Sequence, residues 1–225
     1  MEIRVFPDAA STADAAARSL ARRIGDAVRR RGRADIAVSG GRTPAAMFVV
    51  MVDLTIPWHD LHIWQIDERV APDGDPDRNL GLLAVLPMPA TNVHAMGVSE
   101  ENLVRSASAY ASGLPSRFDV VHLGLGGDGH TASWPPGDPV IDSSASVAIT
   151  EPYKGRVRMT LTPSVVNSAR SRLVVATGAD KAVPFRQWLL EDRSVPIHRV
   201  RIAGTTVFID EAAASASIVG LHAPA

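Results

Sequence analysis

The sequence predicts an α/β fold, with a mainly parallel sheet covered by helices on both faces in an open, Rossmann-like, three-layer arrangement. Short apolar runs typical of buried strands alternate with helical patterns along the chain. Several of these runs end in glycine or polar clusters, as strands do at the carboxyl edge of a parallel sheet. The 225 residues contain no linker, repeat or low-complexity segment, so we expect one domain over residues 1–225.

The first predicted helix covers residues 9–30, where Leu20, Ile24 and Val28 lie four residues apart and form one apolar stripe. Arginines gather on its polar face and around its end. We interpret them as solvated side chains and not as a nucleic-acid-binding patch, because the formal net charge is only −1. They are Arg22, Arg23, Arg29, Arg30, Arg31 and Arg33.

The later elements follow from apolar runs and helix-start signals. Thr43-Pro44 begins a helix because proline is favoured in the first turn, and Ser99 is expected to cap a helix over residues 99–112. The other predicted helices cover residues 79–86, residues 162–169 and a segment that begins at 178–181. The predicted strands cover residues 34–38, 61–66, 118–123, 146–150, 156–161, 173–177 and 205–209, with polar loops at 71–78 and 134–145.

Composition excludes several classes of protein. Hydrophobic residues make up 46% and charged residues 21%, which is ordinary for a globular protein. Without cysteine, disulfides and thiolate metal sites are excluded. The near-zero net charge gives no electrostatic footprint for nucleic acid or an anionic membrane. The first residues lack the pattern of a signal peptide and no apolar run could span a bilayer, so we expect a cytoplasmic protein.

The richest segment for chemistry follows the predicted strand at 118–123, where four glycines surround Asp128 and precede His130. Glycines let the backbone approach a ligand closely, and a histidine oriented by a carboxylate can act as a general base. The alternative is a purely structural histidine. Residues Gly124–Gly129 also fit the Gly-x-Gly-x-x-Gly dinucleotide signature. However, Asp128 and His130 stand where that motif needs a smooth helix start.

Three other strand ends carry polar clusters. The turn from Ser39 to Thr43 leads into a helix amino terminus, whose N–H groups suit a phosphate. Asp67-Glu68-Arg69 offers carboxylates and a fork-shaped anion ligand, or else an ion-paired surface turn. Lys181 opposes the dipole at a helix start, which an anionic ligand would explain, although a solvated side chain is the alternative. The clusters should converge, because parallel strands share one carboxyl edge.

The histidines outside the glycine segment show no spacing typical of metal ligands, so we expect no catalytic metal. They are His59, His62, His94, His122, His198 and His222.

Taken in order, these segments resemble the family that unites 6-phosphogluconolactonases with glucosamine-6-phosphate deaminases. The matching segments are Ser39–Pro44, Trp64–Val70, Asn79, Leu123–Ser133, Arg158–Thr162 and Gly178–Ala182. Arg69 directly after Asp67-Glu68, and Thr-Ala-Ser directly after His130, favour the lactonase side.

The resemblance implies hydrolysis of 6-phospho-D-glucono-1,5-lactone in the oxidative pentose phosphate pathway, with no metal and no redox cofactor. It implies His130 as the general base, with Asp128 orienting it or shaping the loop. Arg69, with Asp67 nearby, would anchor substrate or stabilise the developing oxyanion. The residues expected to hold phosphate and sugar are Gly40, Gly41, Arg42, Thr43, Asn79, Gly129, Arg158 and Lys181. We expect a monomer or weak homodimer with no nucleic-acid or membrane partner.

Two other functions fit the same residues. One is an amino-sugar-phosphate deaminase or isomerase, in which Asp67 would be the base at C2. The other is a catalytically weak phosphosugar-binding paralogue. Arg42, Arg78 and Trp134 depart from the family pattern, and the two arginines add bulk and positive charge near the expected phosphate end. These departures bear on the natural substrate more than on the type of reaction.

Overall fold

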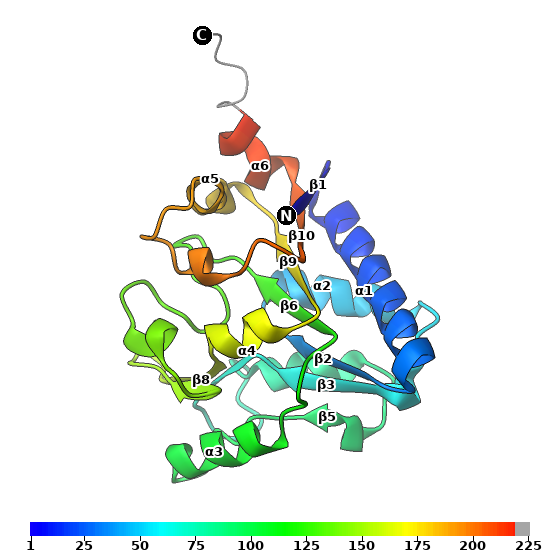
Figure 1. Ribbon diagram of the computed structural model, residues 1–225, viewed down its shortest axis with the longest axis vertical. Helices are drawn as coiled ribbons and strands as arrows, with labels where there is room; N and C mark the ends of the chain where they lie inside the picture. The colour runs from blue at the N-terminus through cyan, green and yellow to red at the C-terminus, as the bar shows by residue number, and fades with distance from the viewer. Residues whose placement is uncertain (219–225) are drawn as a thin grey trace.

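A seven-stranded parallel sheet forms the centre of the molecule, as the alternating pattern predicts (Figure 1). The computed structural model describes residues 1–218. The strand order is β1-β10-β9-β6-β2-β3-β5. The strands are β1 (Glu2–Phe6), β2 (Ala34–Val38), β3 (Leu61–Gln65), β5 (Val93–His94), β6 (Val120–Gly124), β9 (Ser171–Ala176) and β10 (Thr205–Asp210).

Helices cover both faces of this sheet, which confirms the predicted three layers (Figure 1). On one face lie α1 (Ala9–Arg31) and α2 (Arg42–Val52); on the other lie α3 (Leu103–Gly113), α4 (Pro163–Ser168), α5 (Ala182–Leu189) and α6 (Glu211–Ile218). Successive strand residues point to opposite faces. In β9, Leu173 therefore packs into the core under α1 and α2, while Val174 packs into the core on the other side.

Helix α1 is fixed at both ends by its own sequence. The Asp8 carboxylate accepts a hydrogen bond from the Ser11 N–H at 2.8 Å and caps the first turn. Gly32 ends the helix in the left-handed region, with a φ of +75°. Between them, Leu20 and Ile24 are fully buried and Val28 is half-buried, so the predicted apolar stripe faces the sheet.

A second, antiparallel sheet of three strands joins the carboxyl edge of the first. Its strands, in order, are β4 (Asp67–Arg69), β8 (Arg158–Leu161) and β7 (Val147–Ile149). The sequence predicts strands at 146–150 and 156–161, but not that they leave the parallel sheet. Since Arg69 is paired with Arg158 across β4 and β8, the small sheet places two guanidinium groups on neighbouring strands.

Several predicted elements differ in the structure. The helix expected at 79–86 is a 3₁₀-helix, Asn79–Val85. The helix expected at 99–112 begins at Leu103, because the Asn102 side chain and not Ser99 accepts the capping hydrogen bond from the Arg105 N–H at 2.9 Å. The segment that begins at 178 is a 3₁₀ turn before α5. Strands β1, β4 and β5 are missing from the prediction, because β1 is mostly exposed, β4 is a three-residue polar segment and β5 has two residues. The remaining 3₁₀-helices are Trp58–Asp60, Ala90–Asn92, Pro139–Asp142 and Pro196–Arg199.

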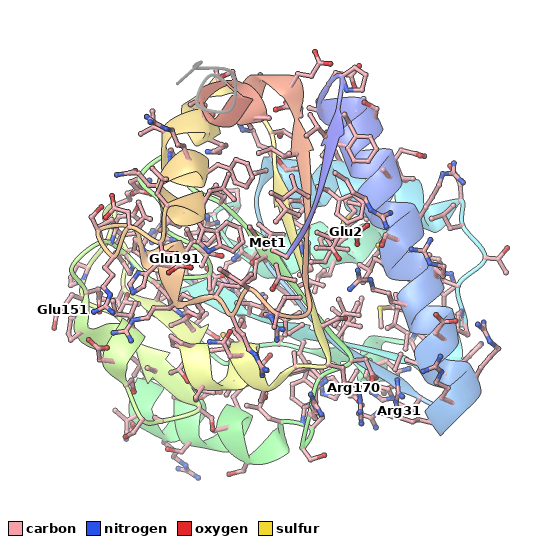
Figure 2. The ribbon with its side chains drawn as sticks, turned by 45° about the horizontal axis from the view of Figure 1, so that its top comes forward. Met1, Glu2, Arg31, Glu151, Arg170 and Glu191 are labelled. Carbon is pink, nitrogen blue, oxygen red and sulfur yellow. The ribbon has the colours of Figure 1, made fainter. Side chains whose placement is uncertain are left out.

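The arginines at the end of α1 lie at the amino-terminal edge of the sheet, away from the carboxyl edge. Arg31 and Arg170, labelled in Figure 2, both form ion pairs with Asp119, at 2.7 and 3.2 Å. Arg23 is half-buried and donates to the Thr206 hydroxyl at 2.8 Å, whereas the other five arginines of this group are exposed, as predicted. No helix in residues 1–218 combines the length and the apolar character needed to cross a bilayer.

Trp134 is a core residue. Its side chain is fully buried among the residues between the sheet and α4 and α5, and its Nε1 donates to the Leu161 carbonyl at 2.8 Å. It therefore does not close over a ligand, and its departure from the family pattern concerns packing.

Trp134→Ala should lower the free energy of unfolding by about 3–5 kcal/mol, the usual cost of truncating a buried tryptophan. Urea unfolding followed by circular dichroism measures this. Val104→Ala on α3, where the valine is 69% exposed, is the control and should change stability by less than about 0.5 kcal/mol. Equal losses in the two variants would contradict the core position of Trp134.

Candidate active site

A cavity of about 680 Å³ lies at the carboxyl edge of the parallel sheet, where β2, β6 and β9 end. All four polar clusters reach its wall, so the predicted convergence is confirmed. The predicted site residues on this wall are Gly40, Gly41, Arg42, Thr43, Asp67, Arg69, Asn79, His130, Arg158 and Lys181. Asp128 and Gly129 do not line the cavity and belong to the loop that carries His130.

The turn between β2 and α2 presents a helix amino terminus to the cavity. Gly41 has a φ of +114°, a conformation that favours glycine, and it turns the chain into α2. Within residues 1–218, no side chain accepts a capping hydrogen bond from the first N–H groups of this helix. The hydroxyl groups of Thr43 and Thr177 lie 2.9 Å apart and join this turn to the end of β9. The turn is suited to hold a phosphate.

Gly40 and Asn79 fit closely against each other. A Cβ atom at Gly40 would lie 2.0 Å from Asn79 Oδ1, so only glycine leaves room for this side chain. The Asn79 Nδ2 donates to the Asp67 carbonyl at 3.0 Å, whereas its buried Oδ1 has no hydrogen-bond partner among the described residues. Asn79 is therefore held on one side and offers a free acceptor on the cavity wall.

Glu68 organises the site from beneath and does not line it. Its fully buried carboxylate accepts hydrogen bonds from Gln65 Nε2 and from the N–H groups of Arg69, Asn79 and Leu80, at 2.7–2.8 Å. The expectation that Asp67 and Glu68 both offer carboxylates to a ligand is therefore wrong for Glu68. The alternative of an ion-paired surface turn is wrong as well, because the segment is largely buried.

Arg78 belongs to the same buried network. Its Nε lies 3.4 Å from Glu68 Oε2 and its Nη1 lies 2.7 Å from Asp73 Oδ1. It does not line the cavity, so its departure from the family pattern adds no charge there. Arg42, in contrast, is exposed and lies on the cavity wall.

Asp67 is a buried carboxyl group on the cavity wall. Ser133 Oγ donates to its Oδ2 at 2.6 Å. Burial raises the pKa of Asp67 above its usual value, and the Ser133 hydrogen bond and the charges of Arg69 and Arg158 act in the opposite direction. The neighbouring guanidinium groups therefore favour the ionised form of a carboxyl that burial alone would keep neutral.

Arg69 and Arg158 bring two positive charges to the same wall. Arg69 Nη1 donates to the Asp77 carbonyl, and Arg158 Nη1 donates to Ser133 Oγ at 3.4 Å. The Nε atoms of both arginines are buried without a hydrogen-bond partner among the described residues. Buried polar groups are normally paired, so two unpaired donors on arginines of the cavity wall favour an anionic ligand there.

His130 and Asp128 form a hydrogen-bonded pair, as the sequence predicts. The Asp128 Oδ1 contacts His130 Nδ1 and also accepts from the His130 N–H at 3.3 Å. Burial opposes ionisation of Asp128, but hydrogen bonds from His130 and Tyr153 outweigh it and hold the pKa of this carboxyl well below its usual value. With Nδ1 held by the carboxylate, the unprotonated nitrogen of neutral His130 is Nε2.

The glycines of this loop shape it around the histidine. A Cβ atom at Gly126 would lie 2.0 Å from His130 Nδ1, so the imidazole packs directly on the backbone. Gly129 has a φ of +81°, a Cβ atom there would lie 2.5 Å from Val195, and its carbonyl accepts from Ile197 N–H at 3.1 Å. Gly129 thus shapes the turn next to the cavity, and its predicted role in substrate binding stays a prediction.

Lys181 is the last residue of the 3₁₀ turn that follows β9, and α5 begins at the next residue. Its Nζ donates to Asp180 Oδ2 at 2.7 Å, and its side chain is 20% exposed. The preceding turn is held by Asp210, whose carboxylate accepts from the Gly178 N–H at 2.9–3.0 Å. The Lys181 hydrogen bond lowers the pKa of Asp180 and burial opposes it, while the charges of Lys181 and Arg42 also lower this pKa. Arg42 and Lys181 therefore both act electrostatically on this carboxylate.

Three residues of the site escape the sequence analysis. Tyr153 Oη donates to Asp128 Oδ2, Ser133 holds Asp67, and Asp210 holds the turn before Lys181. Tyr153 lies in a loop with no periodic signal, and nothing in the chain order links it to a residue 25 positions earlier. Ser133 lies in Leu123–Ser133, one of the segments that resemble the family, and this was the only sequence feature that pointed to it.

No group of three histidine or acidic side chains in residues 1–218 is arranged to hold a metal ion. His222 lies outside the described residues.

The cavity thus brings together an oriented imidazole, a carboxyl group and several positively charged side chains, which suits general-base chemistry on an anionic substrate.

Comparison with known proteins identifies the family. The family described as glucosamine-6-phosphate isomerases/6-phosphogluconolactonase matches residues 7–209. The chain belongs to this family. It is 31% identical to a 6-phosphogluconolactonase of Streptomyces coelicolor, over 100% of this chain and 97% of that protein. The crystal structure of a 6-phosphogluconolactonase from Shewanella baltica is 28% identical, with a TM-score of 0.83 over 93% of this chain and 97% of that one.

A longer protein contains a similar region. The chain is 37% identical, over 176 residues, to the GDH/6PGL endoplasmic bifunctional protein of Oryctolagus cuniculus. That match covers 69% of this chain and spans 22% of the bifunctional protein. Within the isomerase and lactonase family, the chain thus corresponds to one part of that relative and to nearly the whole of the Streptomyces one.

Gly40→Ala should lower the free energy of unfolding by about 1–3 kcal/mol, because the new methyl group overlaps Asn79 and forces it to move. The midpoint of chemical unfolding measures this. Gly81→Ala is the matched control, since a Cβ atom there meets nothing within 4 Å. Unchanged stability of Gly40→Ala would mean that Asn79 does not pack against this turn.

Proposed function

We propose that this protein hydrolyses 6-phospho-D-glucono-1,5-lactone to 6-phosphogluconate in the oxidative pentose phosphate pathway. The observation that carries the proposal is the oriented His130–Asp128 pair in one cavity with Arg69 and Arg158, whose buried Nε atoms lack partners in the described chain. The names of the similar proteins support the same substrate.

His130 acts as the general base in this proposal. Its Nδ1 is held by Asp128, so Nε2 takes a proton from a water molecule as that water attacks the lactone carbonyl. The imidazolium that forms is stabilised by the ionised Asp128 carboxylate. It then returns the proton to the ring oxygen as the carbon–oxygen bond breaks, so the histidine is neutral again after each turnover. No electrons are exchanged with the protein, so the reaction requires no redox cofactor.

The negative charge that develops on the carbonyl oxygen needs fixed positive partners. Arg69 and Arg158 are paired across neighbouring strands and offer unpaired, buried donors, so they require little reorganisation as the charge forms. Asp67 lies with them and balances their charges before substrate binds. We assign Arg69 and Arg158 to the oxyanion and the sugar, and Asp67 and Asn79 to the sugar hydroxyl groups.

The substrate phosphate is assigned to the turn before α2. The N–H groups at the start of α2, the Gly40-Gly41 turn, the Thr43 hydroxyl, Arg42 and Lys181 surround this part of the cavity. Phosphate binding is remote from the carbonyl, and its free energy can hold the lactone in position for attack by water. The proposal also includes a cytoplasmic location and a monomer or weak homodimer as the active species.

His130→Ala should lower kcat by about 10²-fold or more, the usual effect of removing a general base. The measurement is hydrolysis of freshly prepared lactone, corrected for the spontaneous reaction. Near-normal turnover in this variant would remove His130 from the mechanism.

The same preparations test the alternative functions. Ammonia release from glucosamine 6-phosphate by the wild type, without acceleration of lactone hydrolysis, would favour the deaminase. Binding of 6-phosphogluconate without turnover of either substrate would favour a phosphosugar-binding protein. Either result would contradict the proposed reaction and leave the family assignment standing.

Lys181→Ala should raise KM with little change in kcat, because a phosphate contact made equally in the ground and transition states contributes only to binding. Steady-state kinetics on the lactone separates the two constants. Arg18→Ala on α1 is the control for loss of a positive charge, since Arg18 is exposed and paired only with Asp14 by the contacts seen in the described chain. An unchanged KM in Lys181→Ala would exclude Lys181 from phosphate binding.

A further inference from the structure

The turn that links the two later strands of the small sheet lies against the His130 loop. Tyr153 and Arg156 close this turn with hydrogen bonds between their backbone groups, at 2.9 and 3.2 Å. Lys154 and Gly155 at its tip both have positive φ, of 50° and 79°. A tight, doubly bonded turn of this kind holds the Tyr153 ring in one place at the edge of the site.

Tyr153 contacts both members of the proposed catalytic pair. Its hydroxyl donates to Asp128 Oδ2, the carboxylate oxygen that His130 does not use. The same hydroxyl lies 3.1 Å from His130 Nδ1, and the two rings meet edge to face with centroids 5.5 Å apart. Oδ1 of Asp128 thus contacts His130 and Oδ2 accepts from Tyr153, with the exposed Lys154 Nζ 3.6 Å from the same Oδ2, so the carboxylate is held from two sides.

The turn is anchored at its other end to the loop that follows Arg69 and strand β4. Arg156 Nη2 lies 3.1 Å from Asp75 Oδ2 and 3.2 Å from Asp77 Oδ2. The carbonyl of Asp77 in turn accepts a hydrogen bond from Arg69. The turn therefore connects the loop that carries His130 with the loop next to Arg69, which the proposal assigns to the oxyanion and the sugar.

We propose that Tyr153 is a positioning residue that holds Asp128, and through it His130, in the orientation needed for proton transfer. The inference rests on the proposed function. It goes beyond the family resemblance, which assigns the orientation of His130 to Asp128 alone and gives no part to residue 153.

Asp128 is only partly shielded from solvent. Its side chain is 34% exposed, so a carboxylate held by His130 alone could rotate and exchange this partner for water. Burial, followed by the hydrogen bond to Asp128, raises the pKa of Tyr153 above its usual value, so the phenol remains a donor at neutral pH. The second hydrogen bond restricts the carboxylate to the position in which Oδ1 faces His130 Nδ1.

Tyr153→Phe removes the hydroxyl and keeps the ring. It should lower kcat about 10-fold, the usual scale for a hydrogen bond to a charged group, with KM changed less than about 2-fold. Tyr110→Phe is the matched control, because Tyr110 is a core residue whose hydroxyl donates to the Gln65 and His94 carbonyls at 2.9 and 3.2 Å. It should lower stability and leave kcat unchanged.

The pH dependence gives a signature that lost packing alone would not produce. The groups that face Asp128 are His130 in its own loop, Tyr153 and Lys154 in the turn, and Arg158 on β8. Removing the Tyr153 hydrogen bond raises the pKa of Asp128 toward its usual value. Titration of the Asp128 carboxyl carbon followed by NMR should therefore show protonation at a higher pH in Tyr153→Phe than in the wild type. An unchanged titration of Asp128 would contradict the proposal.

A double-mutant cycle tests whether Tyr153 acts through Asp128. In an Asp128→Ala background, Tyr153→Phe should have almost no further effect on kcat, because the carboxylate it positions is absent. Additive losses would overturn the proposal and indicate direct contact with substrate.

NMR of the His130 imidazole separates this inference from the proposed reaction, since it needs no substrate. Tyr153→Phe should shift the His130 ring resonances, and Tyr110→Phe should not. Shifted resonances in a protein without lactonase activity would refute the function and keep the positioning role. Unchanged resonances in an active lactonase would refute only the positioning role.

Discussion

The hydrogen bonds to the Glu68 carboxylate determine how the polar wall of the cavity is built. This fully buried carboxylate accepts from Gln65 at the end of β3 and from the backbone of Arg69, Asn79 and Leu80. A buried charge is costly unless it is fully bonded, so the segments that supply these donors must meet at one point. Asp67 and Arg69 then face the cavity because their neighbour Glu68 points away from it.

The two sheets contribute different parts of the site. The parallel sheet ends in loops whose backbone is shaped by glycines, and these loops hold the imidazole and the helix amino terminus. The antiparallel sheet supplies charged side chains, with Arg69 and Arg158 on adjacent strands. Since the small sheet joins the carboxyl edge of the large one through Ile66, an imidazole and two guanidinium groups from distant segments share one cavity.

The carboxyl groups in and beside the cavity have different electrostatic surroundings. Hydrogen bonds from His130 and Tyr153 hold the pKa of Asp128 well below its usual value, so a carboxylate lies beside the imidazole of His130. Asp67 is more deeply buried, and burial raises its pKa while the Ser133 hydrogen bond and the charges of Arg69 and Arg158 oppose this rise. Arg42 and Lys181 lie by the uncapped start of α2 and the turn before α5, where an anion would complete the local charge balance. One chain thus places its two site carboxyl groups in environments with opposite effects on pKa.

The sequence by itself determined the α/β class, the long elements and the clusters that meet at the carboxyl edge. Periodicity, glycine turns and the order of parallel strands are local or generic signals, and they place His130, Asp128 and Lys181 correctly at strand ends. The tertiary structure alone decided that Glu68 and Arg78 are buried supports, that Trp134 is a core residue, and that Gly129 is a turn residue. It also brought Tyr153 to Asp128. These outcomes depend on contacts between segments far apart in the chain. Residue type and local sequence pattern do not specify which distant side chain each residue contacts.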